Sequence, residues 1–266
     1  MSLLPEKINC YPSARLLQRS SMLVLALLCQ LAVAGEQPPG EFELSYSPAQ
    51  LVTSAALAHF GGLLDPQATV TWSVYVPPGY KREEPAGLLV YASPEPSGAI
   101  PEFWKPVMVA KNLIWIGADG SGNDVNVSLR VSYALLATVL GRQQFTIDPA
   151  RVYITGLSGG GRVASAIAPQ YPHIFRGAIY NCGANTWGEA LPQRIDEVRA
   201  NRYVFVTGTE DFNRKETRQV YAAYRRAGVE AISFMDISHM GHRNPGPAEF
   251  AQAIDFLDGV SVGAVN

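Results

Sequence analysis

A serine lies between glycines in Gly156-Leu-Ser-Gly-Gly160, where an apolar run meets a run of helical period. Residues 152–155 are β-branched or aromatic and favour a short buried strand, whereas residues 162–168 favour a helix. In a strained strand-to-helix turn of the G-x-S-x-G type, the serine hydroxyl points outward and the helix N-terminus stabilises negative charge. The pattern predicts a nucleophile at Ser158. The alternative is a glycine-rich turn with a solvated serine.

Two neighbouring acids follow the strand-like residues 203–208 and compete to orient a catalytic base. Asn213 and Glu216 have the spacing of a capping box, which predicts that they cap the next helix. Asp211 then has no structural task, so we favour it over Glu210 as the orienting acid. A purely structural role for both acids is the alternative.

Two of the four histidines, His239 and His242, come just after the strand-like residues 231–238. Gly241 allows the loop to fold sharply before His242, whereas His239 lies almost within the end of the strand. We therefore favour His242 as the base. The His-x-x-His spacing also fits a metal site, but no third ligand of convincing spacing accompanies it, and we expect neither a metal nor an organic cofactor.

The elements that must position these residues alternate along the chain. Strand-rich runs bounded by Gly, Pro or Asp alternate with runs of helical period, which predicts a mostly parallel central sheet with helices on both faces. In such sheets the reactive residues follow the carboxyl ends of strands. The predicted strands lie within residues 69–77, 87–93, 112–119, 152–156, 177–181, 203–208 and 231–238, and the predicted helices within 128–142, 213–228 and 247–259.

The composition is that of a globular protein without a basic surface. The chain has 266 residues, of which 47% are hydrophobic and 17% are charged, enough for one sizeable core or two small ones. Its formal net charge is −2, and Lys and Arg form no cluster. Nucleic acids and anionic membranes need a basic footprint, so we expect neither as a partner.

The first 34 residues have the order of a secretory signal peptide. Basic residues precede a short apolar run that ends in an A-x-A cleavage signal at Ala34. This predicts a signal peptide over residues 1–34, a single domain over residues 35–266, and a secreted or periplasmic protein. A membrane anchor is the alternative, although the run is short of the ~20 residues that a span needs. Lipidation at Cys29 is disfavoured because Leu28 precedes it.

Cys182 is the only cysteine beyond the predicted signal peptide, so no internal disulfide is expected. It lies in a strand-like run, and we interpret it as a small buried apolar residue rather than a catalytic thiol.

Four segments together resemble the α/β-hydrolase superfamily, and within it the small secreted esterases related to polyhydroxybutyrate depolymerases and feruloyl esterases. They are residues 101–123, 152–165, 208–214 and 240–245, and the resemblance covers roughly residues 70–258. It implies Ser158 as nucleophile, Asp211 as acid and His242 as base, in the order of serine, acid and histidine that this fold uses.

The resemblance also implies an oxyanion hole. The backbone N–H of Gly159 is one expected donor, and the loop after the strand within residues 87–93 should supply the second. Prolines in that loop lack an N–H group, which leaves four candidates: Ser93, Glu95, Ser97 and Gly98. Trp104 and Trp187 could line an apolar substrate pocket, or they could pack in the core.

These features predict a secreted serine hydrolase that forms an acyl-enzyme. A carboxylic ester hydrolase acting on a small-molecule or polymer ester fits best. A serine peptidase of the same fold and a catalytically silent secreted binding protein are the alternatives, because a triad acts on esters and amides alike.

Overall fold

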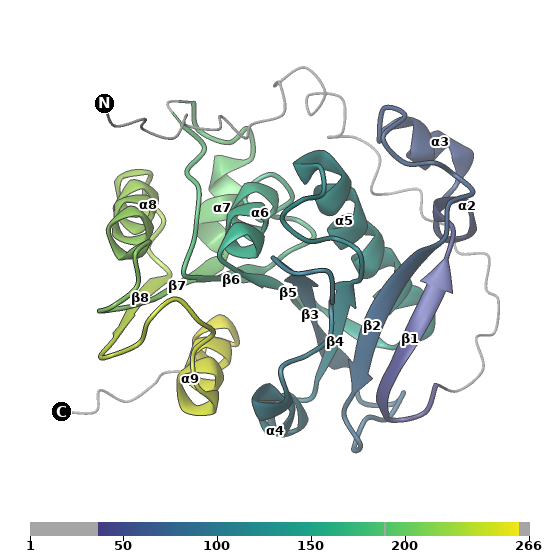
Figure 1. The fold of residues 1–266 in the computed structure, drawn as a ribbon, viewed down its shortest axis with the longest axis horizontal. Coiled ribbons are helices and arrows are strands. Elements are labelled where there is room, and N and C mark those ends of the chain that lie inside the picture. Colours follow the sequence, from purple (N-terminus) through teal and green to yellow (C-terminus); the bar gives the residue numbers. More distant parts are fainter. Residues whose placement is uncertain (1–36, 189, 261–266) are drawn as a thin grey trace.

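The computed structural model of the chain describes residues 37–188 and 190–260, and its strands form one eight-stranded sheet (Figure 1). The strand order is β1-β2-β4-β3-β5-β6-β7-β8. β2 runs antiparallel to both of its neighbours, whereas β4 to β8 are joined by parallel pairs. The predicted mostly parallel sheet is confirmed. The strands are β1 Gly40–Tyr46, β2 Val70–Val76, β3 Ala86–Ala92, β4 Leu113–Ala118, β5 Ile147–Leu157, β6 Gly177–Asn181, β7 Arg202–Gly208 and β8 Ile232–Ile237.

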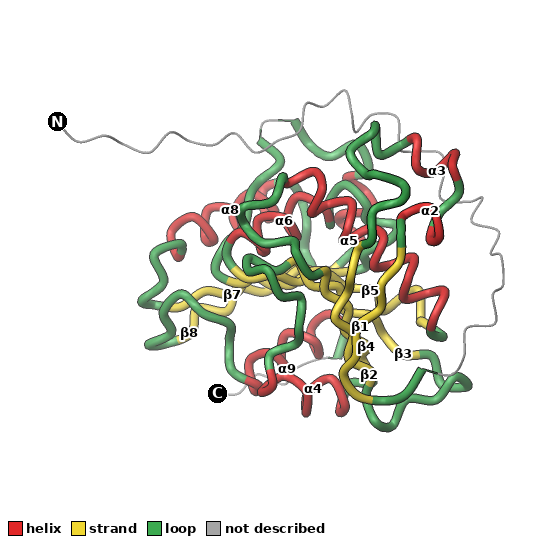
Figure 2. Tube along the Cα trace, turned by 45° about the vertical axis from the view of Figure 1, so that its right-hand side comes forward, coloured by secondary structure: helices red, strands yellow, loops and turns green. Residues whose placement is uncertain are grey.

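Helices cover both faces of the sheet, as predicted. Helices α5, α6 and α8 lie over one face, and α4 and α9 lie over the other (Figures 1 and 2). The predicted helices 128–142, 213–228 and 247–259 correspond to α5, α8 and α9. The helices are α2 Pro48–Leu51, α3 Ser54–Ala58, α4 Lys105–Ala110, α5 Val127–Gln144, α6 Gly159–Ile167, α7 Ile195–Ala200, α8 Arg214–Arg226 and α9 Pro247–Leu257, with a 3₁₀ turn, η2, at Glu102–Trp104.

The central strands are buried on both sides, which explains their continuous apolar sequences. In β3, Leu88 and Val90 belong to the core cluster beneath α5 and α6, whereas Leu89 and Tyr91 belong to the cluster beneath α4 and α9. Because side chains alternate along a strand, one strand fills both layers. The sheet is therefore a rigid base whose loops can carry a site.

The sequence analysis did not predict the first strand, β1. Residues before 69 carried no predicted element, but β1 pairs antiparallel with β2 along its whole length. Its side chains alternate between exposed and half-buried because it lies at the edge of the sheet, so its apolar signal is weak. β5 also begins earlier than predicted, at Ile147.

The predicted signal peptide, residues 1–34, lies outside the described residues. Within the part of the chain that is described, no helix is both long enough and apolar enough to cross a membrane.

Candidate active site

Ser158 occupies a strained turn between β5 and α6. Its φ is +54° and its ψ is −117°, a conformation that non-glycine residues rarely adopt. Its backbone N–H donates to the carbonyl of Asn181 at 2.8 Å. Gly160 permits the turn to pack against the end of β3, because a Cβ there would overlap the carbonyl oxygen of Ala92. The strand-to-helix context that the serine motif requires is therefore present.

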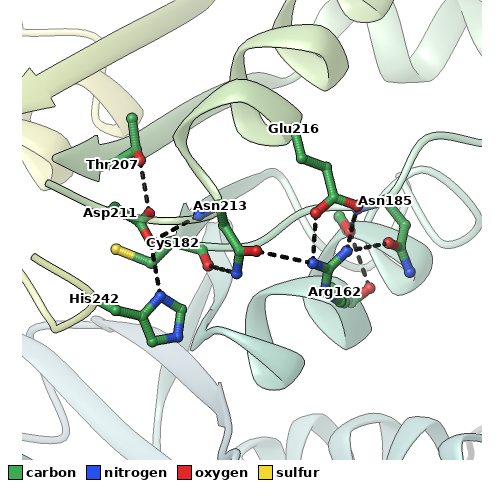
Figure 3. A network of polar contacts seen from close by, with 9 residues as sticks. Arg162, Cys182, Asn185, Thr207, Asp211, Asn213, Glu216 and His242 are labelled. Carbon is green, nitrogen blue, oxygen red and sulfur yellow. Dashed lines mark hydrogen bonds and ion pairs between the residues drawn. The ribbon is translucent and has the colours of Figure 1, made fainter. Parts of the chain in front are cut away.

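Asp211 and His242 form a hydrogen-bonded pair after β7 and β8 (Figure 3). The Asp211 Oδ1 to His242 Nδ1 distance is 2.8 Å; the Asp211 side chain is 0% exposed and that of His242 is 22% exposed. The carboxylate also accepts hydrogen bonds from Thr207 Oγ1 at 2.7 Å and from the backbone N–H of Asn213 at 3.0 Å. Three donors thus surround one buried acid.

The surroundings of Asp211 keep it ionised. Burial raises the pKa of the carboxyl group, but the hydrogen bonds from His242, Asn213 and Thr207 together outweigh burial and hold the pKa below its ordinary value. An ionised carboxylate only accepts hydrogen bonds, so the proton in the pair belongs to His242 Nδ1. In the neutral imidazole this leaves Nε2 as a proton acceptor.

Close backbone packing brings the two loops together. A Cβ at Gly208 would overlap the carbonyl oxygen of Met240, and the same carbonyl accepts the N–H of Glu210 at 3.1 Å. The loop turns tightly after Gly241, where the N–H of Arg243 donates to the Gly241 carbonyl at 2.9 Å, but Gly241 itself is not in the left-handed region; His239, with φ +56°, is. The close approach of the two loops therefore depends on Gly208, at the end of β7.

Residues 182 and 183 connect the serine turn with the Asp–His pair. Gly183 packs on the backbone of Ser158, where an added Cβ would lie 3.1 Å from the Ser158 Cα. The Sγ of Cys182 lies within 4.8 Å of the ligand atoms of both Asp211 and His242. The three residues predicted from sequence therefore gather around the end of β6.

This sheet and its helices are shared with enzymes of known structure. The poly(3-hydroxybutyrate) depolymerase LpqC from Bordetella parapertussis aligns over 83% of this chain and 90% of its own, with a TM-score of 0.61 and 18% identity. A ferulic acid esterase aligns over 84% of this chain and 98% of its own, with a TM-score of 0.59 and 16% identity. The chain has the α/β-hydrolase fold.

Two further comparisons concern sequence families and peptidases. A model of the prolyl oligopeptidase family matches residues 134–193 of this chain, a stretch that includes the Ser158 turn. Dipeptidyl peptidase 4 from Porphyromonas gingivalis aligns over 73% of this chain but 34% of its own, with a TM-score of 0.55 and 14% identity. No curated protein sequence matches the chain.

The predicted capping box at the start of α8 does not form. Asn213 is the N-cap residue but its side chain makes no capping hydrogen bond. Glu216 instead binds the Arg162 guanidinium through both oxygens, at 2.5 and 2.6 Å, and the Asn213 amide donates to the Cys182 carbonyl at 2.8 Å (Figure 3). A bidentate bond to a guanidinium is stronger than one to a backbone N–H. The network ties α6 to the loop that carries Asp211.

Cys182 is buried, as predicted, but its contact with the acid was missed. Its thiol donates to the Arg243 carbonyl at 3.4 Å. Burial raises the pKa of the thiol to about 12, and the nearby Asp211 carboxylate adds to the rise. Metal ligation needs a thiolate, and Asp211 and His242 already bind each other, so we assign no metal here. The sequence feature that could have indicated this contact is the position of Cys182 at the end of a strand-like run, where site residues gather in such sheets.

The loop after β3 uses some of its candidate oxyanion donors internally. The N–H of Gly98 donates to Asp119 Oδ1 at 2.7 Å, and that of Glu95 to Ser93 Oγ at 3.0 Å. This leaves Ser93 and Ser97 as backbone candidates. Gly159 is the first residue of α6, where N–H groups lack intrahelical acceptors.

The two tryptophans have different surroundings. Trp104 is fully buried, stacks on Phe250 at 4.0 Å and donates to the Pro245 carbonyl at 3.1 Å, which supports core packing rather than a pocket wall. Trp187 is half-buried against Tyr224. The exposed aromatic beside the Asp–His pair is one that sequence reasoning missed: Phe212 is 76% exposed and its ring stacks on His242 at 4.0 Å.

Proposed function

We propose that the protein is a serine hydrolase that cleaves carboxylic esters, with Ser158 as nucleophile, His242 as general base and Asp211 as the acid that orients it. The observation that carries this proposal is the buried 2.8 Å pair of Asp211 and His242 at the same edge of the sheet as the strained serine turn. The order of strands that carry the three residues is the one this fold uses for catalysis.

The reaction follows from the hydrogen bonds. His242 Nε2 takes the Ser158 proton while Oγ bonds to the ester carbonyl carbon, and the developing negative charge lies on the carbonyl oxygen. The alcohol leaves with the proton that His242 returns. Water then attacks the acyl carbon and gives a proton to His242, which passes it to Ser158 Oγ as the acyl–Oγ bond breaks and the carboxylic acid is released. The N–H of Gly159 and one of Ser93 or Ser97 are the proposed backbone donors to the oxygen.

A fluorophosphonate probe and an aryl ester test this proposal on the purified mature protein. Wild type should be labelled and should hydrolyse the ester, whereas Ser158→Ala should do neither. Ser54→Ala changes an exposed serine on α3 and serves as the matched control, with unchanged labelling. A folded wild type that neither labels nor turns over any substrate would support the silent binding protein instead.

A serine peptidase is the second candidate, because the prolyl oligopeptidase family model matches residues 134–193. Ester and amide cleavage share the same triad, so the scissile bond must be tested directly. We expect kcat/KM for short-chain aryl, feruloyl and acetyl-sugar esters to exceed that for dipeptide anilides. Efficient anilide cleavage with poor ester cleavage would favour the peptidase.

We also propose that residues 1–34 direct export and are removed. Export predicts that the protein recovered from the extracytoplasmic space begins at Gly35, which N-terminal sequencing measures. An intact N-terminus in a membrane fraction would support the anchor instead.

A further inference from the structure

The loop after β4 is fastened to the loop that holds the oxyanion candidates. The N–H of Asn123 donates to the Pro94 carbonyl at 2.9 Å, and that of Gly120 donates to the Pro96 carbonyl at 2.6 Å. These two bonds hold the backbone of Asn123 in place, so its side chain projects from a fixed point.

That side chain lies directly over the residue after the proposed nucleophile. A Cβ added to Gly159 would overlap Asn123 Oδ1 and would lie 3.1 Å from Asn123 Nδ2. Asn123 is nevertheless exposed to solvent. Its carboxamide is therefore at the surface that a substrate must approach to reach Ser158.

A buried arginine sets the orientation of the carboxamide. Arg130 lies in α5, and its guanidinium donates to Asn123 Oδ1 at 3.3 Å and to the Ser93 carbonyl at 2.7 Å. Flipping the amide would place its N–H groups against those of Arg130, which has no acceptor. Nδ2 must therefore point away from the arginine. Among residues 37–188 and 190–260, no acceptor binds Nδ2.

We propose that Asn123 is a further catalytic residue, whose Nδ2–H donates to the ester carbonyl oxygen at Ser158, and that Arg130 is the positioning residue that directs this donor. The inference rests on the proposed hydrolase function. Asn123 joins the N–H of Gly159, and its donor is held before the substrate arrives, as effective oxyanion donors are. The positive charge of Arg130 lies behind both Asn123 and Ser93, where it favours an anionic oxygen.

Asn123→Asp tests the donor with little change of shape, because the acid keeps an oxygen for Arg130 and loses the N–H groups. We expect kcat/KM for an aryl ester to fall by about 10²-fold, mainly through kcat, because the bond strengthens as charge develops. Asn126→Asp is the matched control. It adds the same charge three residues away, and Asp can replace Asn126 as the N-cap that binds the Ser128 N–H. This control should stay within about threefold of wild type.

Asn123→Ala separates the lost donor from the added charge. It should also lower kcat, by about 10-fold or more, and should slow fluorophosphonate labelling of Ser158 in parallel. Thermal unfolding of each variant checks that the fold is kept. If wild type is labelled and both Asn123 variants label and turn over like wild type, the inference is wrong and the hydrolase proposal stands. If wild type itself is inert, the proposed function fails first.

A double-mutant cycle tests the role of Arg130. Arg130→Lys should lower kcat when Asn123 is present and should have little further effect on Asn123→Ala, because the arginine acts through that side chain. An equal loss in both backgrounds would overturn the positioning role.

Discussion

Two acid–histidine pairs lie side by side in the loops after β7 and β8, and they differ in nearly every other respect. Asp211 and His242 are 2.8 Å apart, with side chains 0% and 22% exposed. Glu210 and His239 are 3.2 Å apart, with side chains 61% and 88% exposed. In each pair the acid lies in the loop after β7 and the histidine in the loop after β8, so the two pairs occupy similar positions in the fold.

The difference gives a physical reason to propose Asp211 and His242, rather than Glu210 and His239, as the catalytic acid and base. The buried carboxylate is held by three hydrogen-bond donors and has its pKa lowered by them against the effect of burial. The exposed pair has solvent around both partners, and ion pairs of that kind are worth at most about 1 kcal/mol. In a low-dielectric site the charge of Asp211 acts on His242 far more strongly.

The largest difference in kcat between the two pairs should appear when each histidine is replaced in turn. His242→Ala removes the proposed base, and kcat should fall towards the level of Ser158→Ala, by a factor on the order of 10⁶ as for other triads. His239→Ala should keep most activity, because its ring lies in solvent. Steady-state hydrolysis of an aryl ester measures both. If His239→Ala is the inactive variant, His239 and not His242 is the base.

Neutralising the two acids should give the next largest contrast. Asp211→Asn keeps the shape but removes the charge and the acceptor that fixes the imidazole tautomer, so kcat should fall by about 10⁴-fold. Glu210→Gln should change kcat less than about threefold. Should neither acid matter while Ser158 still labels, the orienting carboxylate must lie elsewhere.

The residues at strand ends were predictable because strand periodicity and turn composition are local signals. Ser158, Asp211 and His242 each follow a predicted strand, and the parallel sheet brings such positions to one edge. The choice between Asp211 and Glu210 also came from sequence, but by an argument that the structure does not support, since the capping box of Asn213 and Glu216 does not form.

The missed features depend on contacts between segments far apart in the chain. Glu216 at the start of α8 binds Arg162 of α6, and Asn123 reaches Gly159 because two loops are joined by backbone hydrogen bonds. Neither contact can be predicted from the residues next to it in the sequence. Gly208 was noted as a strand boundary, but its close packing on Met240 follows only from the sheet order.

The buried pair also has an aromatic neighbour, because the ring of Phe212 stacks on that of His242. Phe212→Ala should raise KM for aryl esters and lower kcat/KM by about 2- to 10-fold, the range of a single aromatic contact. Phe103→Ala is the matched control, since Phe103 is also an exposed phenylalanine but packs on Trp104. Equal effects of both substitutions on kcat/KM would show that Phe212 contributes only general packing.

One threonine contacts each pair, and replacing these threonines should give the smallest difference between the two pairs. Thr207 donates to Asp211 Oδ2 at 2.7 Å, whereas Thr209 Oγ1 accepts the N–H of His239 at 2.9 Å. Thr207→Val removes a hydrogen bond to a buried charge and should lower the free energy of unfolding by about 1–3 kcal/mol, with a several-fold loss of kcat. Thr209→Val, which affects the exposed pair, should cost less than about 1 kcal/mol and leave kcat unchanged.

The pH dependence of unfolding tests the cause of that contrast. Because the Asp211 pKa is lower in the folded than in the unfolded protein, its ionised form stabilises the fold above the ordinary carboxyl pKa. This contribution is lost as the pH falls through the lower, folded value. Thr207→Val removes one of the hydrogen-bond donors that lower the pKa of Asp211 in the folded protein. The difference between the folded and unfolded pKa of Asp211 therefore becomes smaller. The variant should therefore be less stable than wild type at pH 7, and the difference should shrink in denaturant titrations below about pH 4. A difference that stays constant from pH 7 to pH 3 would mean that Thr207 stabilises the fold by packing and not through the charge of Asp211.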